Sequence, residues 1–220
     1  MTKRELKPTV HGVGYVGIGD FKPSNNGLDT KEYSVWKDML KRCYSEKFIQ
    51  KNPTYRGCSV CEEWHNFQNF AEWLVLQKHH NCNYHLDKDI LCDGNKIYSP
   101  ENCVLAPIQI NSLLVDSRAS RGVYPIGVGY SKSKERYQAY ITIDGKQKHL
   151  GYYGDLDSAS KAYRSAKHAN IKRVALKWRD SIDKSLFDAL IKKSEQYKYS
   201  RKSDYTPDCH TFRVYYLNRC

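Results

Sequence analysis

Apolar residues recur at the spacing of an amphipathic helix in two stretches of the first half of the chain. Residues Lys31 to Ile49 and Glu62 to Gln77 both place apolar side chains at i, i+3, i+4 and i+7, which brings them to one helix face. We therefore predict two helices that pack their apolar faces in a core, with Thr30 capping the first. The apolar positions are Trp36, Met39, Leu40 and Cys43 in the first helix, and Trp64, Phe67, Phe70, Ala71, Trp73 and Leu74 in the second.

The pattern changes between His85 and Asn111 and predicts two short strands followed by a helix. His85 to Ile90 alternates as a strand does, a loop rich in turn-forming residues follows, and Cys103 to Leu105 is a short apolar strand. Pro107 is then expected to open a helix. This stretch therefore predicts a compact ββα unit, with the two helices before it packed around it as a brace.

Two polar side chains of this unit carry oxygen atoms that suit a metal ion. Asp87 lies on the first predicted strand and Asn111 on the predicted helix, and the two converge where the helix folds back over the strands. Carboxylate and amide oxygens favour a hard divalent cation such as Mg2+. We therefore expect Asp87 and Asn111 to bind Mg2+ or Mn2+.

Strand-like alternation returns in the second half and predicts a three-stranded antiparallel sheet. Strands are expected at Gly122–Tyr130, Arg136–Ile143 and Gln147–Tyr153, with Asp144-Gly145 as the hairpin turn between the last two. Asp155 or Asp157 then caps a helix whose stripe of small residues lets it lie close across the sheet. Together with the ββα unit, these elements predict an α+β fold. The stripe consists of Ala159, Ala162, Tyr163, Ala166 and Ala169.

The same patterns divide the chain into two folded domains joined by a short polar linker, DSRASR. A last amphipathic helix is expected at Asp180 to Tyr197, before a tail that mixes basic and aromatic residues. The predicted segments are an N-terminal arm at 1–30, a first domain at 31–115, the linker at 116–121, a second domain at 122–178, and the C-terminal helix and tail at 179–220.

Positive charge is concentrated in the second half of the chain. Residues 1–115 carry 14 Lys and Arg against 13 Asp and Glu, and residues 116–220 carry 22 against 11, which together give the totals of 36 and 24. Aromatic residues, 13% of the chain, are interleaved with these charges. Such a composition favours a nucleic-acid partner over a merely solvated surface.

Cysteine content and the lack of an export signal indicate an intracellular protein. No apolar run is long enough to span a membrane, and no signal-peptide core follows the first residues. The 8 cysteines therefore favour reduced thiols or a metal site over disulfides. Cys58 and Cys61 form a CxxC pair, which leaves structural Zn2+ open, but we favour buried thiols because no second pair is present. The other candidate zinc ligands are His79, His80, Cys82, Cys92 and Cys103.

The motif HLDKDILCDGNKIYSPENCVLAPIQIN resembles the HNH, or ββα-metal, nuclease motif of phage and intron homing endonucleases. The stretches YSVWKDMLKRCY and GCSVCEEWHNFQNFAEW resemble the leader region of phage proteins of this family, which extends the resemblance to about residues 33–115. The family implies that Asp87 and Asn111 bind the catalytic metal and that Asn102 clamps the loop. It has a water-activating histidine at the position of Lys88.

Because Lys88 is not a histidine, we assign the role of general base to His85, which lies on the same side of an ideal strand as Asp87. Lys88 is then expected to hold the scissile phosphate. Asp89 is either a further metal ligand or the partner of Lys88.

The sequence GVYPIGVGYSKSKERYQAYITIDGKQKHLGYYGDLDSASKAYRSA resembles the AP2 DNA-binding domain over about residues 121–175. Members of that family lay their sheet in the major groove of double-stranded DNA. Alternation places Tyr137, Ala139 and Ile141 toward the helix and the residues between them outward. By position, the resemblance assigns DNA-facing sites to Arg121, Tyr124, Gln138, Tyr140, Thr142, Gln147 and His149, and phosphate contacts to Lys132, Lys134, Arg136, Lys146 and Lys148.

Three functions remain open at this stage. The first is a metal-dependent DNA endonuclease of the homing type, acting as a monomer on double-stranded DNA, which is the function that we expect. The second is a DNA-binding protein whose HNH unit has lost catalysis and serves as a scaffold or docking surface, and the lysine at position 88 motivates it. The third is a regulator or inhibitor that uses the basic half to bind a nucleoprotein.

Overall fold

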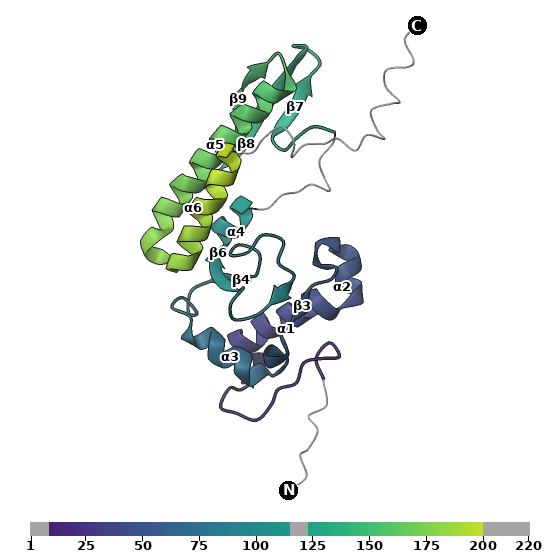
Figure 1. Ribbon diagram of the computed structural model, residues 1–220. Coiled ribbons are helices and arrows are strands. Elements are labelled where there is room, and N and C mark those ends of the chain that lie inside the picture. Colours follow the sequence, from purple (N-terminus) through teal and green to yellow (C-terminus); the bar gives the residue numbers. More distant parts are fainter. Residues whose placement is uncertain (1–8, 115–122, 200–220) are drawn as a thin grey trace. The chain divides into compact units, whose positions relative to one another are not determined.

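The structure is a computed structural model that describes residues 9–114 and 123–199, with side chains described as far as Tyr197. Chain contacts divide it into two compact units (Figure 1). Unit 1 comprises the described part of Met1–Ser112 with Ile182–Leu186, and unit 2 the described parts of Leu113–Ser181 and Phe187–Cys220. The predicted linker, with Arg121, lies outside the described residues, as does the predicted tail from Lys198 except for its first two residues, which belong to a helix. Helices and small sheets are mixed in the chain, as expected for an α+β fold.

The first predicted helix is present but ends earlier than expected. Helix α1 (Lys31–Tyr44) is capped by Thr30 and buries all four of its predicted apolar positions. The prediction that it continues to Ile49 is wrong, because Ser45 has extended backbone and its side chain caps a new helix, α2 (Glu46–Lys51). A serine hydroxyl that accepts a hydrogen bond from a nearby backbone N–H favours the start of a helix over the continuation of the previous one. A second helix therefore begins here.

The second predicted helix is likewise divided by a capping residue. A 3₁₀ turn, η2 (Glu62–His65), precedes α3 (Phe67–Leu76), and the side chain of Asn66 accepts from the backbone of Gln68 to cap α3. The aromatic side chains pack as predicted into a single core, with Trp64 and Trp73 ring centroids 4.6 Å apart. The indole of Trp36 donates to the carbonyl of Trp64, which joins α1 to this turn.

The N-terminal segment of unit 1 is held by one glutamine of α3. The amide of Gln68 donates to the carbonyls of Val16 and Phe21 and accepts from the backbone N–H of Phe21. A small hairpin of β1 (Ser24–Asn25) and β2 (Leu28–Asp29) follows.

The ββα unit is observed with shifted boundaries. Strand β4 (Tyr84–Asp87) pairs antiparallel with β6 (Val104–Pro107), and α4 (Ile108–Leu114) follows directly. Two predictions need correction: the first strand ends at Asp87 rather than Ile90, because the Asp87 carboxylate turns the chain, and Pro107 closes β6 instead of opening the helix. In the loop between β4 and β6, β5 (Ile97–Tyr98) pairs parallel with β3 (Ser59–Val60).

Unit 2 contains the predicted three-stranded sheet. Strands β7 (Val128–Ser131), β8 (Arg136–Ile143) and β9 (Lys146–Tyr153) are antiparallel in the order β7-β8-β9, and α5 (Leu156–Trp178) contacts all three (Figure 1). The first strand begins at Val128 rather than Gly122. The side chain of Asp155 caps α5 by accepting from the backbone of Ser158 at 2.8 Å.

Three local features complete unit 2. Asp144 and Gly145 both have positive φ, 50° and 77°, which is the backbone of the predicted hairpin turn. The predicted small-residue stripe is only partly correct, because Ala159 and Tyr163 are buried but Ala169 is exposed. A 3₁₀ turn, η4 (Arg179–Ser181), leads to α6 (Lys184–Tyr199).

Gly127, just before β7, lies close against Tyr163 of α5. It has a φ of 72°, and a Cβ atom at this position would overlap the ring of Tyr163. We expect Gly127→Ala to lower the free energy of unfolding by about 2–4 kcal/mol, through backbone strain together with overpacking. Urea unfolding measures this change.

Gly145→Ala is the matched control, because Gly145 has a φ of 77° but no atom lies within 4 Å of the added carbon. Backbone strain alone should therefore lower the free energy of unfolding by about 1 kcal/mol. Equal losses in both variants would contradict the close approach.

Candidate functional site

Asp87 ends β4 with its carboxylate held at one oxygen. Its Oδ1 atom accepts from the backbone N–H groups of Asp89 at 2.7 Å and Ile90 at 2.8 Å. Within the described chain the carboxylate has no other hydrogen bond, so Oδ2 is left for another partner. Burial raises the pKa of the Asp87 carboxyl above its usual range, and the two backbone hydrogen bonds oppose this shift.

Asn111 lies on α4 and presents a buried amide oxygen. Its Oδ1 atom is inaccessible to solvent and has no hydrogen-bond partner among the described residues. Leaving such a group unpaired costs about 1–3 kcal/mol. A carboxylate and an amide oxygen are the ligand types that a hard divalent metal such as Mg2+ or Mn2+ prefers.

His85 shares one side of β4 with Asp87. Its imidazole is exposed, whereas Leu86, between the two, points into the core and is 6% exposed. In the register of the strand pair, His85 lies opposite Ala106 and Asp87 opposite Val104. The sequence prediction that the two side chains lie on the same side of the strand therefore agrees with the alternation of burial.

Lys88 is buried in the loop that follows β4. The residue is 4% exposed, and its Nζ atom donates to the carbonyl of Asn95 at 2.9 Å and to the carboxylate of Asp89. It also lies 5.7 Å from the centroid of the Tyr98 ring. Of the two roles open to Asp89, the structure confirms the ion pair with Lys88. The Lys88 amine donates to acceptors inside the loop and does not face solvent. This position disagrees with the prediction that Lys88 contacts the scissile phosphate.

The amide groups of Asn95 and Asn102 shape the loop at two points. Asn95 donates to the carbonyls of Lys88 and Ile97 and accepts from the backbone of Ile97. Asn102 donates to the hydroxyl of Ser99 at 3.0 Å, just before β6. Asn102 was expected as a loop clamp. Asn95 was not singled out as a site residue, although the Asp93-Gly94-Asn95 cluster marks it as a turn residue.

The thiols of unit 1 belong mainly to the apolar core. Cys43, Cys58 and Cys103 are buried, and burial raises the pKa of Cys43 and of Cys103 to about 12. Within the described ranges, no group of three or more His, Cys, Asp or Glu side chains is arranged to hold a metal ion. The buried positions agree with the interpretation of Cys43, Cys58 and Cys103 as packing residues.

In unit 2, the side of the sheet that faces away from α5 is polar and aromatic. Gln138, Tyr140 and Thr142 of β8 occupy it, opposite Tyr152, His149 and Gln147 of β9. The ring of His149 lies between those of Tyr140 and Tyr152, with centroids 5.1 Å and 4.6 Å away. We call this surface the outer sheet face. Its described residues include no carboxylate: Gly129, Ser131, Arg136, Gln138, Tyr140, Thr142, Gln147, His149 and Tyr152.

Tyr152 is a member of this face that simple alternation misses. A β-bulge after Ala139 shifts the register, so that Ala139 pairs with Gly151 but Tyr140 pairs with His149. Leu150 is the extra residue, and the shift brings Tyr152, 45% exposed, to the outer sheet face. A glycine inside the strand, Gly151, was the available sequence signal for a bulge. Its φ in the structure is 137°.

Five residues assigned to DNA lie outside the outer sheet face. Lys146 and Lys148 pair with Ile143 and Ile141, so they alternate with the outer sheet face and are exposed on the edge strand. The ring of Tyr124 packs on that of Tyr137, 6.0 Å away, on the side of Ala139 and Ile141. Lys132 and Lys134 are exposed in the turn between β7 and β8.

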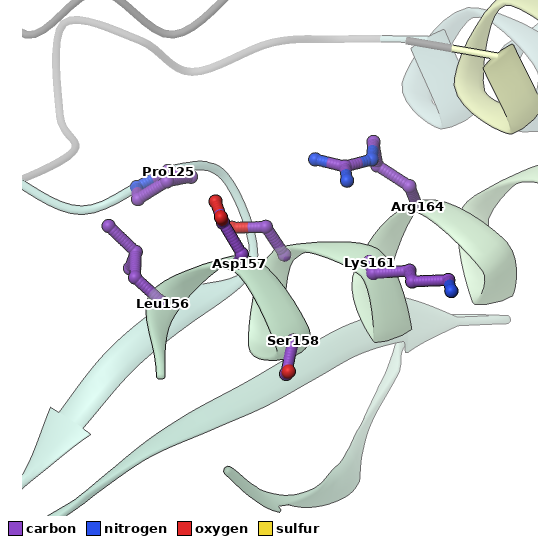
Figure 2. A pocket seen from close by; sticks show the side chains of 7 residues that line it. Pro125, Leu156, Asp157, Ser158, Lys161 and Arg164 are labelled. Carbon is purple, nitrogen blue, oxygen red and sulfur yellow. The ribbon is translucent and has the colours of Figure 1, made fainter. Parts of the chain in front are cut away.

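A small open hollow at the start of α5 contains none of the predicted site residues. Its volume is about 260 Å3, and both basic and acidic side chains line it (Figure 2). Its lining consists of Pro125, Leu156, Asp157, Ser158, Ser160, Lys161 and Arg164.

Comparisons of the chain with protein-family models, curated proteins and solved structures gave no match. In the described ranges, no helix has both the length and the apolar character needed to cross a membrane.

Proposed function

We propose that the chain is a metal-dependent endonuclease that binds double-stranded DNA and hydrolyses its phosphodiester bonds. In this proposal the ββα unit is a nuclease site of HNH type and the sheet of unit 2 belongs to an AP2-like DNA-binding domain. The observation that carries it is the buried, unpaired Oδ1 of Asn111, on the helix that directly follows the strand paired with that of Asp87. A protein retains such an oxygen at a cost in stability, which is typical of a ligand position.

Asp87 and Asn111 would hold the metal in this site. When bound, Mg2+ or Mn2+ would offset the negative charge that develops on the scissile phosphate and on the leaving oxygen. Asp87 contributes a carboxylate fixed at Oδ1 by two backbone N–H groups, so its second oxygen keeps a constant position. Asn102 acts at a distance from the chemistry by holding the chain before β6.

His85 is the residue that we assign to accepting the proton of water. Its imidazole is exposed on the same side of β4 as Asp87, and imidazoles exchange protons in the physiological pH range. Lys88 does not serve this purpose, because its amine donates to Asp89 and Asn95 inside the loop.

The outer sheet face supports duplex DNA as the substrate. It combines hydrogen-bonding side chains and aromatic rings with no described carboxylate, and Lys132 and Lys134 extend from the adjacent turn. Amide, hydroxyl and imidazole groups contact base edges, whereas lysines contact phosphates.

The proposal is tested by incubating the purified protein with supercoiled plasmid in Mg2+ or Mn2+. We expect nicked or linear product that EDTA abolishes, and a His85→Ala variant slower by about 10²–10⁴-fold, as for loss of a general base. His11→Ala, which removes an exposed histidine of the same unit, is the control and should cleave normally. Undiminished cleavage by His85→Ala would remove that residue from the mechanism.

One observation favours a second function. Lys88 occupies the position of the water-activating histidine, and it is buried rather than directed at solvent. If the protein binds duplex DNA but cleaves no plasmid that carries its recognition region, it is a DNA-binding protein in which the ββα unit serves as a scaffold.

A further inference from the structure

The loop of residues 88–96 is closed by a reciprocal pair of hydrogen bonds between its ends. Lys88 Nζ donates to the backbone carbonyl of Asn95 at 2.9 Å, and Asn95 Nδ2 donates to the backbone carbonyl of Lys88, also at 2.9 Å. Asn95 is itself fixed by two further hydrogen bonds with the backbone of Ile97. We call this arrangement the Lys88–Asn95 clamp.

The charge of Lys88 is compensated inside the loop. Its ammonium contacts the Asp89 carboxylate and lies over the Tyr98 ring, although the Lys88 side chain is only 5% exposed. Burying an ammonium group is expensive unless it is paired and hydrogen-bonded. The clamp and Asp89 supply these partners, so the buried ammonium of Lys88 is compensated.

The clamp and Asp87 share one peptide unit, because the Lys88 carbonyl that accepts from Asn95 and the Asp89 N–H that donates to Asp87 belong to the same peptide group. Lys88 begins the loop, and the next two backbone N–H groups, those of Asp89 and Ile90, are the donors that hold Asp87 Oδ1. Their orientation therefore depends on the path that the clamp imposes on the loop. If the loop opened, the two donors would lose their alignment with the carboxylate, although Asp87 itself would be unchanged.

We propose that Lys88 is a positioning residue of the nuclease site, which acts through the Lys88–Asn95 clamp to hold the Asp87 carboxylate for metal binding. This inference rests on the proposed function. Functional groups must be held to within roughly 0.5 Å of their productive position, and the residues that orient a metal ligand contribute to its affinity. The role also accounts for a lysine beside Asp87, since only a long donor reaches across the loop to Asn95.

The test compares Lys88→Met, which keeps the length of the side chain but removes its donors, with Lys88→Arg, which keeps donors. In DNA-free protein, we expect Lys88→Met to speed hydrogen exchange of the Asp89 and Ile90 amides by about 10-fold or more. Its Mn2+ affinity, followed by electron paramagnetic resonance, should fall by about 10–100-fold. Lys88→Arg should change both quantities by less than about threefold.

Lys96→Met is the matched control. Lys96 is an exposed lysine of the same loop, and its Nζ donates to the carbonyl of Thr54 outside the clamp. This variant should leave the Asp89 and Ile90 amides and the Mn2+ affinity unchanged. If Lys88→Met does not fold, Asn95→Ala removes the other half of the clamp and should have the same two effects.

The outcomes separate the clamp from the proposed function. Wild-type exchange at Asp89 and Ile90 in the folded Lys88→Met or Asn95→Ala variant would overturn the positioning role, even if the wild-type protein binds Mn2+ and cleaves DNA. A wild-type protein that binds no Mn2+ would overturn the nuclease function, and the positioning role with it. Faster amide exchange together with weaker Mn2+ binding supports the inference.

Discussion

Replacing Asn111 by leucine is expected to abolish cleavage while raising the free energy of unfolding in metal-free buffer by about 1–3 kcal/mol. The buried Oδ1 has no partner in the described chain, so an apolar side chain of similar size removes the cost of an unpaired polar atom. The same change removes the proposed metal ligand. Few substitutions act in opposite directions on stability and activity, and those that do mark a functional site.

Urea unfolding with and without Mg2+ measures the stability change, and plasmid cleavage measures activity. Wild-type protein should be stabilised by Mg2+ at concentrations above its dissociation constant, whereas Asn111→Leu should not respond. Gln109→Leu, an exposed position of the same helix, is the control and should change stability by less than about 0.5 kcal/mol without loss of cleavage. A destabilised Asn111→Leu variant would mean that the amide is satisfied, and retained cleavage would exclude Asn111 as a ligand.

Placing carboxylates on the outer sheet face is expected to weaken duplex binding by about 100-fold. The double variant Gln138→Glu and Thr142→Glu adds two negative charges to a surface that has none among its described residues. Repulsion from phosphates and loss of base-edge contacts both lower affinity. Fluorescence anisotropy with a labelled duplex, at several salt concentrations, measures the loss.

The control for this variant carries the same charge change on the other side of the domain. Ser165→Glu with Ala169→Glu alters two exposed positions of α5, the helix that covers the opposite side of the sheet. Affinity near physiological salt should fall by less than about threefold, because charges farther than a Debye length from the phosphates are screened. Equal losses in both double variants would show that net charge, and not the outer sheet face, determines binding.

Local patterns predicted the parts of the fold that depend on local physics. The core positions of α1 and α3 follow from helical periodicity, and the hairpin turn at Asp144-Gly145 follows from two residues that tolerate positive φ. Ser45 and Asn66 were missed as helix caps, although both residue types favour that position.

The site was predictable in its residue types but not in its hydrogen bonds. Asp87 and Asn111 stand out by chemistry and order, and the observed ββα arrangement carries both. The burial of Lys88 and its pairing with Asn95 depend on the course of a nine-residue loop, which no periodicity describes. The register shift that brings Tyr152 to the outer sheet face likewise depends on how two strands pair, and alternation within one strand contains no information about it.

The two lysines of β9 that do not belong to the outer sheet face have a consequence for solubility. Strand β9 ends the sheet, so its free backbone groups are a template on which another chain could add a strand. Lys146 and Lys148 are exposed along this edge, and two strands that approached each other there would bring like charges together. The lysines thereby disfavour edge-to-edge aggregation through this strand.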